Sequence, residues 1–284
     1  MAPEAKSHDL LYVSGGCGGV CVLTYPGGKM VGALAEPGAE GLCVDSAGDI
    51  FVVNFWGPSE SAGDIVEYAH AGTTPIQTIA DPGFYPQACS VDQVTGDLAI
   101  ANEAGALPGG GPGNVTIYHT STKTFVGYRD AKIYYYSFVA YDDAGNLFVD
   151  GSNPAPFRLA RLSTSHKFTN IKVNQTIGFP RNLQWSGKNL AIAATPNLID
   201  HVAIAGSKGT VVSKTVLDGP VTAIEVQFWI DGRTIAVPYG AQSDDIYEVG
   251  LWKYPAGGKP TKVIQNTQFS NELFGVTISP AQSR

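Results

Sequence analysis

The chain has 284 residues, of which 15% are charged, and its formal net charge is −7. Lys and Arg residues form no cluster along it, so the basic footprint of a nucleic-acid-binding protein is missing. No run of residues approaches the roughly 18 consecutive apolar positions of a membrane-spanning helix. We therefore expect neither nucleic-acid binding nor insertion into a membrane.

The remaining composition favours many short strands. Hydrophobic residues make up 44% of the chain, which also contains 34 Gly and 18 Pro, and no long window shows apolar residues at helical spacing. The sequence predicts an all-β protein with little or no helix. We expect residues 1–8 to be a disordered or tag-like N-terminus, residues 9–280 to form a single domain, and residues 281–284 to be a tail.

The two ends of the chain complement each other. Residues 10–14, LLYVS, resemble the second strand of a repeated unit whose first strand is missing. Residues 272–279, ELFGVTIS, resemble that first strand, with Val276 in the place of Val44. Pairing of the two segments would close a ring of sheets and remove exposed strand edges.

Residues 41–55, GLCVDSAGDIFVVNF, read as a strand, a tight turn and a second strand, and this pattern returns along the chain. Further copies begin at Ala88, Phe138, Asn182 and Val226. The turn glycines are separated by 48, 49, 42 and 45 residues, a spacing typical of propeller blades. Within the turns, we expect an aspartate to accept backbone hydrogen bonds as an Asx cap, at Asp45, Asp92 and Asp142.

A second hairpin follows each inner pair. The six outer hairpins begin at Gly19, Gly63, Gly113, Phe157, His201 and Val249. Residues 25–29, YPGGK, and residues 254–260, YPAGGKP, mark the same turn between a third and a fourth strand. The sequence thus predicts a six-bladed β-propeller with four-stranded antiparallel blades, closed by pairing the N-terminal strand with the C-terminal strand.

Residues 40–54, EGLCVDSAGDIFVVN, and residues 86–102, PQACSVDQVTGDLAIAN, resemble the NHL-repeat pattern P-x-G-I-A-V-D-x-x-G-N-I-Y-V-A-D. The chain is similar to the NHL-repeat group of six-bladed propellers and, more broadly, to senescence-marker lactonases, paraoxonases, strictosidine synthases and virginiamycin B lyase. This resemblance implies the propeller fold. It implies no single activity, because the group contains lactonases, lyases, hydrolases and binding modules.

In such propellers, the loops into the first strands and the loops between second and third strands open on one face around a central channel. Mixed aromatic and polar linings are usual for ligand pockets, and Arg181 would anchor a carboxylate or phosphate. The candidate ligand-binding residues on this face are Glu40, Asn54, Trp56, Gln87, Asn102, Glu103, Arg181, His201, Tyr239 and Glu272.

A divalent cation is a further possibility at the channel mouth. Ca²⁺ prefers carboxylate, amide and carbonyl oxygens, and the candidate ligands are Glu40, Asn54, Asn102 and Glu272. In the lactonase-like relatives, a Ca²⁺ held by Glu, Asn and Asp polarises the ester. Arg181 departs from that pattern, because it places a positive charge near any cation.

The four cysteines allow three disulfide pairings. Cys17 and Cys21 are close enough for a local bridge, and Cys43 and Cys89 lie near the starts of equivalent strands in adjacent blades. The alternative is that both pairs are small, buried, reduced side chains.

The scarcity of Lys and Glu and the abundance of Gly, Ser, Thr and Asn favour an exported protein whose leader is absent from this sequence, with a cytoplasmic protein as the alternative.

The five histidines show no metal-ligand spacing, and the sequence contains no GxSxG, P-loop or CxxC motif. We therefore interpret the chain as an exported, monomeric, non-catalytic propeller without a resident cofactor. It would bind a small molecule or a protein on the channel face. The alternative is a Ca²⁺-dependent lactonase, hydrolase or lyase that acts at the channel mouth.

Overall fold

The structure is a computed structural model, and the chain divides into two compact units. The first unit comprises Met1–Ala80 and Leu217–Arg284, and the second comprises Asp81–Val216. The structure describes residues 1–56, 63–105, 111–153, 156–178, 180, 182–195, 197–219, 227–241, 246–269 and 273–281.

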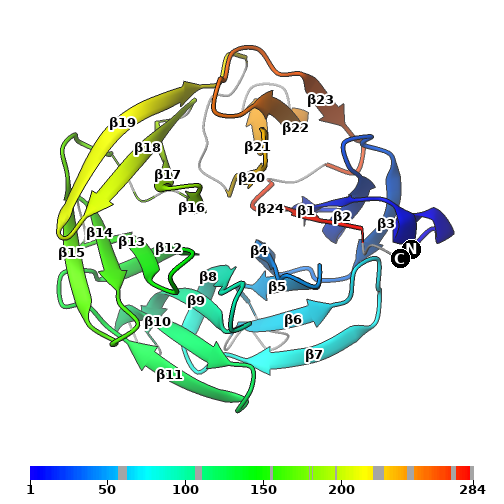
Figure 1. Cartoon of the computed structure of the whole chain (residues 1–284). Helices are drawn as coiled ribbons and strands as arrows, with labels where there is room; N and C mark the ends of the chain where they lie inside the picture. Colours follow the sequence, from blue (N-terminus) through cyan, green and yellow to red (C-terminus); the bar gives the residue numbers. More distant parts are fainter. Residues whose placement is uncertain are drawn as a thin grey trace. The chain divides into compact units, whose positions relative to one another are not determined.

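The described part of the first unit contains three four-stranded antiparallel sheets (Figure 1). Their orders are β24-β1-β2-β3, β4-β5-β6-β7 and β20-β21-β22-β23. The strands are β1 (Leu10–Gly16), β2 (Gly19–Thr24), β3 (Met30–Leu34), β4 (Ala39–Val44), β5 (Ile50–Asn54), β6 (Asp64–Tyr68), β7 (Pro75–Ala80), β20 (Trp229–Asp231), β21 (Thr234–Ala241), β22 (Ile246–Lys253), β23 (Lys262–Gln265) and β24 (Val276–Ser279).

The predicted pairing of the chain ends is confirmed. Strand β24 pairs antiparallel with β1, from Leu10 opposite Ser279 to Val13 opposite Val276. All four residues of β24 are at most 5% exposed. The last strand in sequence is therefore an internal part of the first unit.

Strand β1 is buried on both faces. Because successive side chains of a strand point to opposite faces, Leu10 and Tyr12 pack with the apolar residues of β4–β6. Leu11 and Val13 pack instead with residues of β21 and β22. Full burial of each such aliphatic side chain contributes about 1.5–3 kcal/mol, so the sheet of β1 is held between the other two sheets of its unit.

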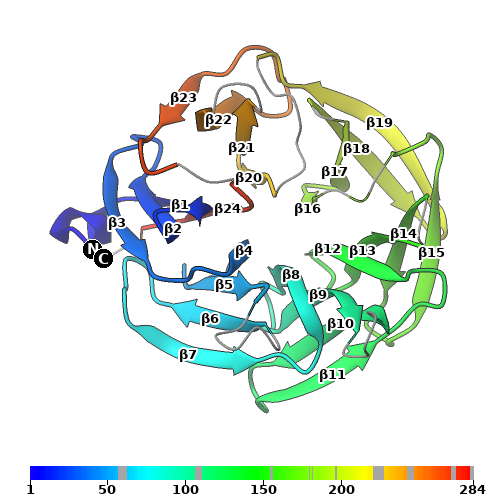
Figure 2. The same cartoon turned by 180° about the vertical axis from the view of Figure 1, so that it is seen from behind.

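The described residues of the second unit form one four-stranded sheet, of order β11-β10-β9-β8, and one eight-stranded sheet, of order β12-β13-β14-β15-β19-β18-β17-β16 (Figure 2). The strands are β8 (Phe84–Val91), β9 (Leu98–Gly105), β10 (Gly111–His119), β11 (Thr124–Tyr128), β12 (Tyr135–Tyr141), β13 (Leu147–Ser152), β14 (Phe157–Leu162), β15 (Phe168–Val173), β16 (Leu183–Ser186), β17 (Asn189–Thr195), β18 (Leu198–Ala205) and β19 (Lys208–Val216).

The eight-stranded sheet differs from the separate four-stranded sheets that the sequence predicted. It consists of two four-stranded antiparallel arrays whose outer strands, β15 and β19, run parallel where they meet. The link is short: Lys172 lies opposite Lys208 and Val173 opposite Gly209. The backbone N–H of Lys172 donates to the Ser207 carbonyl at 2.9 Å, and the N–H of Asn174 donates to the Gly209 carbonyl at 2.9 Å. The backbone N–H groups at this edge of β15 are therefore hydrogen-bonded to the neighbouring segment instead of to water.

The turns inside the inner hairpins form as predicted. In each of three turns, an aspartate Oδ1 accepts the backbone N–H of the residue two positions later at 2.9 Å, at Asp45, Asp92 and Asp142. The turn glycines have φ values of 84°, 75° and 76°, at Gly48, Gly96 and Gly145. Side chains with a Cβ rarely adopt this conformation, so local backbone chemistry explains both residue types.

The N-terminal residues, expected to be disordered or tag-like, form a short 3-10 helix, η1 (Pro3–Ser7), in the structure. Ala5 is fully buried in the core of the first unit, and the N–H of Ala2 donates to the Val31 carbonyl at 2.6 Å. Burial of Ala5 and pairing with β3 explain why the segment is ordered.

Among the described residues, no helix is long and apolar enough to cross a membrane.

Candidate functional site

The ten predicted site residues are divided between the two units. Four lie in the first unit: Glu40, Asn54, Trp56 and Tyr239. Another four lie in the second unit: Gln87, Asn102, Glu103 and His201. Arg181 and Glu272 lie outside the described residues. The convergence of all ten on one opening stays a prediction.

Asn54 lies at the end of β5 in a buried hydrogen-bond network. Its side chain is 5% exposed, and Nδ2 donates to Glu36 Oε2 and to Asp64 Oδ1, each at 2.8 Å. The Tyr68 hydroxyl donates to the other oxygen of Glu36. The Asn54 amide therefore holds two carboxylates, on the segment before β4 and on β6, next to the end of β5.

Asn102 occupies a similar place at β9 in the second unit. It is fully buried, and Nδ2 donates to Asn114 Oδ1 at 3.0 Å and to Thr116 Oγ1 at 3.2 Å. The Thr116 hydroxyl donates in turn to Asp81 Oδ1 at 2.7 Å. Burial raises the pKa of Asp81. This chain of polar contacts links the segment before β8 to β9 and β10.

Tyr239 and His201 are also buried, at 4% and 6% exposure. The Tyr239 hydroxyl donates to Glu248 Oε2 on β22 at 2.5 Å, and burial, followed by the Glu248 carboxylate, raises the Tyr239 pKa. His201 Nε2 lies 2.8 Å from Thr215 Oγ1. Burial lowers the His201 pKa, which favours the neutral imidazole.

Glu40 belongs to a contact between segments that are distant in the sequence. The Ser14 hydroxyl donates to the Glu40 backbone carbonyl. Gln227, which sequence reasoning missed, accepts the N–H of Leu42 at 2.8 Å and donates to the Leu42 carbonyl at 2.5 Å. A Cβ on Gly275 would overlap the Glu40 carbonyl oxygen, so this close approach requires glycine. The only sequence signal for Gln227 was an amide beside the apolar run of residues 228–230.

The other predicted residues are more accessible. Trp56 is 50% exposed, and its ring lies edge-on to Phe55 with 5.0 Å between ring centroids. Gln87 and Glu103 are half-buried, and burial raises the pKa of Glu103.

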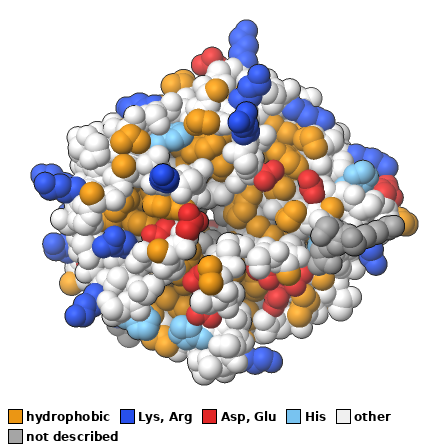
Figure 3. Space-filling model, viewed as in Figure 1, with side chains coloured by type: hydrophobic (Ala, Val, Ile, Leu, Met, Phe, Trp, Pro, Cys, Tyr) orange, Lys and Arg blue, Asp and Glu red, His pale blue; other side chains and the backbone are white. Residues whose placement is uncertain are grey.

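On the face shown in Figure 3, Lys and Arg side chains are distributed singly or in small groups among apolar and acidic ones.

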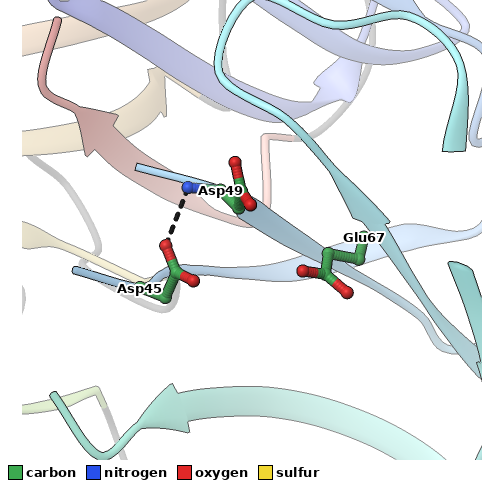
Figure 4. Close-up of side chains that lie close together, drawn as sticks. All are labelled: Asp45, Asp49 and Glu67. Atoms are coloured by element: carbon green, nitrogen blue, oxygen red, sulfur yellow. Dashed lines mark hydrogen bonds between the residues drawn. The ribbon is translucent and has the colours of Figure 1, made fainter. Parts of the chain in front are cut away.

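An acidic cluster that the sequence did not predict lies in the sheet of β4–β7. Ligand oxygens of Asp45, Asp49 and Glu67 all lie within 4.8 Å of one another (Figure 4). Burial, followed by the neighbouring aspartates, raises the pKa of Glu67, and burial followed by Asp45 raises that of Asp49. Asp45 Oδ1 accepts the Asp49 N–H at 2.8 Å, and Gln77 Nε2 donates to Glu67 Oε2 at 2.5 Å. These contacts within the sheet explain the positions of Asp45 and Glu67.

The first unit contains a cavity of about 790 Å³ between η1, the turn after β2, and strands β21 and β22. Its lining is mixed polar and apolar: Glu4, His8, Thr24, Tyr25, Pro26, Gly27, Lys29, Thr234, Leu251, Thr261 and Lys262. The YPGGK turn, which the sequence assigned only a backbone role, therefore contributes side chains to this cavity.

The lysines and the glutamate of this cavity are already partnered. Lys29 Nζ lies 2.7 Å from Glu4 Oε1, and Lys262 Nζ donates to the Gly27 carbonyl at 2.6 Å. Burial raises the pKa of Tyr25, whose hydroxyl interacts with Thr234 and Asp231. The cavity therefore combines an aromatic ring and hydroxyl groups with lysine side chains that already contact a carboxylate or a carbonyl of the protein.

The cysteines are oxidised. Cys17 and Cys21 form a disulfide, Cys43 and Cys89 are also disulfide-bonded, and no cysteine is free. The alternative of buried, reduced cysteines is therefore wrong. Two disulfides are typical of proteins in an oxidising compartment.

No family model and no curated protein matches this sequence. Among solved structures, a chain in the crystal structure of a nidogen/laminin complex is similar, with a TM-score of 0.73 and 14% sequence identity. The similarity covers 97% of this chain and 100% of that chain. The nidogen part of that complex is a six-bladed β-propeller. At this identity the likeness shows the fold alone: the chain has a propeller-like, all-β fold.

Proposed function

We propose that this chain is a non-catalytic, propeller-like binding protein of an oxidising compartment, and that it binds a small, neutral, hydroxyl-rich molecule. The observation that supports this function is the 790 Å³ cavity of the first unit. Its volume lies in the range of about 300–1,000 Å³ typical of small-molecule sites. The two disulfides support export.

The complete architecture that we propose is an NHL-like, monomeric, six-bladed ring. The strands support six blades, because β24 with β1–β3 and the five successive groups β4–β7, β8–β11, β12–β15, β16–β19 and β20–β23 each form four antiparallel strands. The pairing of β24 with β1 supports closure by the two ends of the chain.

The lining of the cavity favours a neutral ligand over an ion. Because Lys29 pairs with Glu4 and Lys262 with a carbonyl, a charged ligand would have to displace these contacts. Tyr25 and Pro26 offer apolar surface, and the hydroxyl groups of Tyr25 and Thr234 provide polar contacts. A saccharide or a similar polyol presents both a flat apolar face and several hydroxyls.

Binding is favoured over catalysis because two of the buried candidates already donate hydrogen bonds to carboxylates. Asn54 joins two carboxylates, and Tyr239 is bonded to Glu248. The alternative is a Ca²⁺-dependent hydrolase or lyase with Glu40, Asn54, Asn102 and Glu272 as ligands. This alternative stays a prediction, and the experiments therefore include an assay of lactone and ester turnover with added Ca²⁺.

The test is a thermal-shift and calorimetric titration of the whole chain with neutral monosaccharides and disaccharides. A ligand at 100 times its Kd raises the free energy of unfolding by about 2.7 kcal/mol. Tyr25→Phe removes one hydroxyl from the cavity and should weaken binding about 2- to 10-fold. Tyr254→Phe is the matched control, because Tyr254 holds the equivalent place in the turn between β22 and β23, outside the cavity lining.

Equal binding by wild type and both variants would show that the ligand occupies another place. If no neutral saccharide binds, the proposed ligand class is wrong. Turnover of lactones or esters that depends on added Ca²⁺ would instead establish the alternative.

A further inference from the structure

The second unit contains a separate cavity of about 690 Å³, and none of the predicted site residues that the structure describes lines it. It lies beside the start of β14, strand β15 and the residues after β15, and Lys132 contributes from the segment before β12. Its volume is also within the range of small-molecule sites, about 300–1,000 Å³.

Three cationic side chains line this cavity, from Lys132, Arg158 and Lys172. Among the described residues, none of these three side chains forms an ion pair or a hydrogen bond. Lys208 lies opposite Lys172 across the junction of β15 and β19 and adds positive charge nearby. This contrasts with the cavity of the first unit, whose lysines are partnered.

The charge of the whole chain makes this group unusual. The second unit has eleven Lys and Arg residues against nine Asp and Glu, a formal net charge of +2. The first unit has seven against sixteen, a formal net charge of −9. The unpaired cations therefore lie in the unit whose formal net charge is positive.

Two carboxylates lie close to the cavity lining, and both are engaged elsewhere. Asp130 is 8% exposed; its Oδ1 accepts the backbone N–H of Lys132 and its Oδ2 accepts Asn170 Nδ2, each at 2.7 Å. Asp200 is fully buried, accepts Gln175 Nε2, and lies 3.7 Å from Lys214 Nζ. These carboxylates position the loop and the amides of the lining, and they offset only part of its positive charge.

The lining also has an apolar part, formed by Phe157, Ile171, Val173 and Ile177. Arginine presents a planar fork of donors that suits carboxylate, sulfonate and phosphate groups, and lysine adds a mobile point charge. Apolar side chains beside such a fork select ligands with an apolar portion over a bare inorganic ion.

We propose that this cavity binds an organic anion that carries an apolar group. The anionic head would pair with Arg158, assisted by Lys132 and Lys172, and the apolar portion would pack on Phe157 and Ile177. This site is separate from the cavity of the first unit, because it lies in the other unit and would take a different class of ligand.

The test uses the full chain and phenyl phosphate as the probe, titrated by calorimetry at low and high salt. Inorganic phosphate supplies the head alone, and benzyl alcohol supplies the apolar part alone. We expect phenyl phosphate to bind at least tenfold more tightly than either and to weaken as ionic strength rises. Arg158→Gln and the double variant Lys132→Gln/Lys172→Gln should each weaken binding about tenfold or more.

Lys188→Gln is the matched control, because Lys188 is an exposed cation of the same unit outside the cavity lining, and it should bind like wild type. If Arg158→Gln fails to fold, protection of Lys132 and Lys172 from an amine-acetylating reagent by phenyl phosphate, read by mass spectrometry, tests the site in the native chain. Equal weakening in Lys188→Gln, equal affinity for inorganic phosphate, or no protection would overturn the proposal.

Discussion

The Ser279 hydroxyl donates a 2.6 Å hydrogen bond to the backbone carbonyl of Gly48, so the last strand of the chain contacts the turn of the first inner hairpin. His70 Nδ1 lies 2.6 Å from the same hydroxyl. Ser279 is fully buried, and burial lowers the pKa of His70. One side chain therefore connects β24, the turn between β4 and β5, and the turn between β6 and β7.

Ser279→Ala should destabilise the protein by about 1–3 kcal/mol, because it leaves a buried carbonyl and a ring nitrogen without this partner. Urea unfolding, followed by circular dichroism, measures the change. Ser121→Ala, in the exposed turn after β10, is the control and should change the free energy of unfolding by less than about 0.5 kcal/mol. Equal effects of the two substitutions would contradict a structural role for Ser279.

Gly275→Ala should be strongly destabilising, because the new Cβ would overlap the Glu40 carbonyl oxygen and lie 2.9 Å from Ser14 Oγ. Overpacking of this kind costs about 1–3 kcal/mol or more. Gly178 has no neighbour within 4 Å of an added Cβ, so Gly178→Ala should be neutral or slightly stabilising. Thermal unfolding of both variants checks the contrast, and similar melting temperatures would show that the segments at Gly275 separate easily.

Glu67→Gln should raise the free energy of unfolding at pH 7. Burial and two aspartates raise the folded-state pKa of Glu67 above its ordinary 4.5, so between the unfolded and folded pKa values the folded state binds more protons than the unfolded state. Stability therefore falls as pH rises through the folded pKa, and neutralising Glu67 removes this loss. The amide oxygen of the introduced glutamine can still accept the hydrogen bond from Gln77.

The measurement for this prediction is the melting temperature of wild type and Glu67→Gln between pH 4 and pH 8. The difference should be largest at neutral pH and should shrink towards pH 4, where the glutamate becomes protonated in both states. Asp218→Asn removes an exposed carboxylate of the same unit; it is the control and should leave the pH dependence of the melting temperature unchanged. A melting-temperature difference between the two proteins that grows towards pH 4 would contradict the prediction.

The Cys17–Cys21 disulfide closes a short loop, so its loss should have a modest effect. A loop of this size constrains the unfolded chain by about 2 kcal/mol. The double variant Cys17→Ser/Cys21→Ser should lose about that much stability in urea. Alkylation of the denatured, unreduced wild-type protein should label no cysteine, whereas labelling of two or four would show that the disulfides do not form.

Much of the fold was predictable because its determinants are local. Asp45 and Gly48 specify a turn through an Asx hydrogen bond and a positive φ, and the copies of that turn reveal the repeat. The pairing of Leu10 with Ser279 was predictable from complementary incomplete repeats at the two ends. The parallel contact of Lys172 with Lys208 was not, because it depends on the geometry of two strand edges and leaves no residue pattern.

The candidate sites were less predictable. Sequence reasoning identified Asn54 and Tyr239 as candidate ligand-binding residues at strand ends, but it could not identify Asp64 and Glu248, the cross-strand partners that engage them. It also assigned Arg158 and Lys172 no role, since charged residues on outer strands are ordinarily solvated.

The sequence by itself determined the strands, the turns and the order of the repeats, because hydrophobic alternation and turn chemistry act within a few residues. The tertiary structure decided which polar groups are engaged and which are available. Gln227 hydrogen-bonds to Leu42, 185 positions away in the chain. Asp130 accepts a hydrogen bond from Asn170, while the ammonium group of the nearby Lys132 forms no ion pair among the described residues. These outcomes depend on the side chains that each sheet brings together, and the spacing of residues in the sequence does not contain that information.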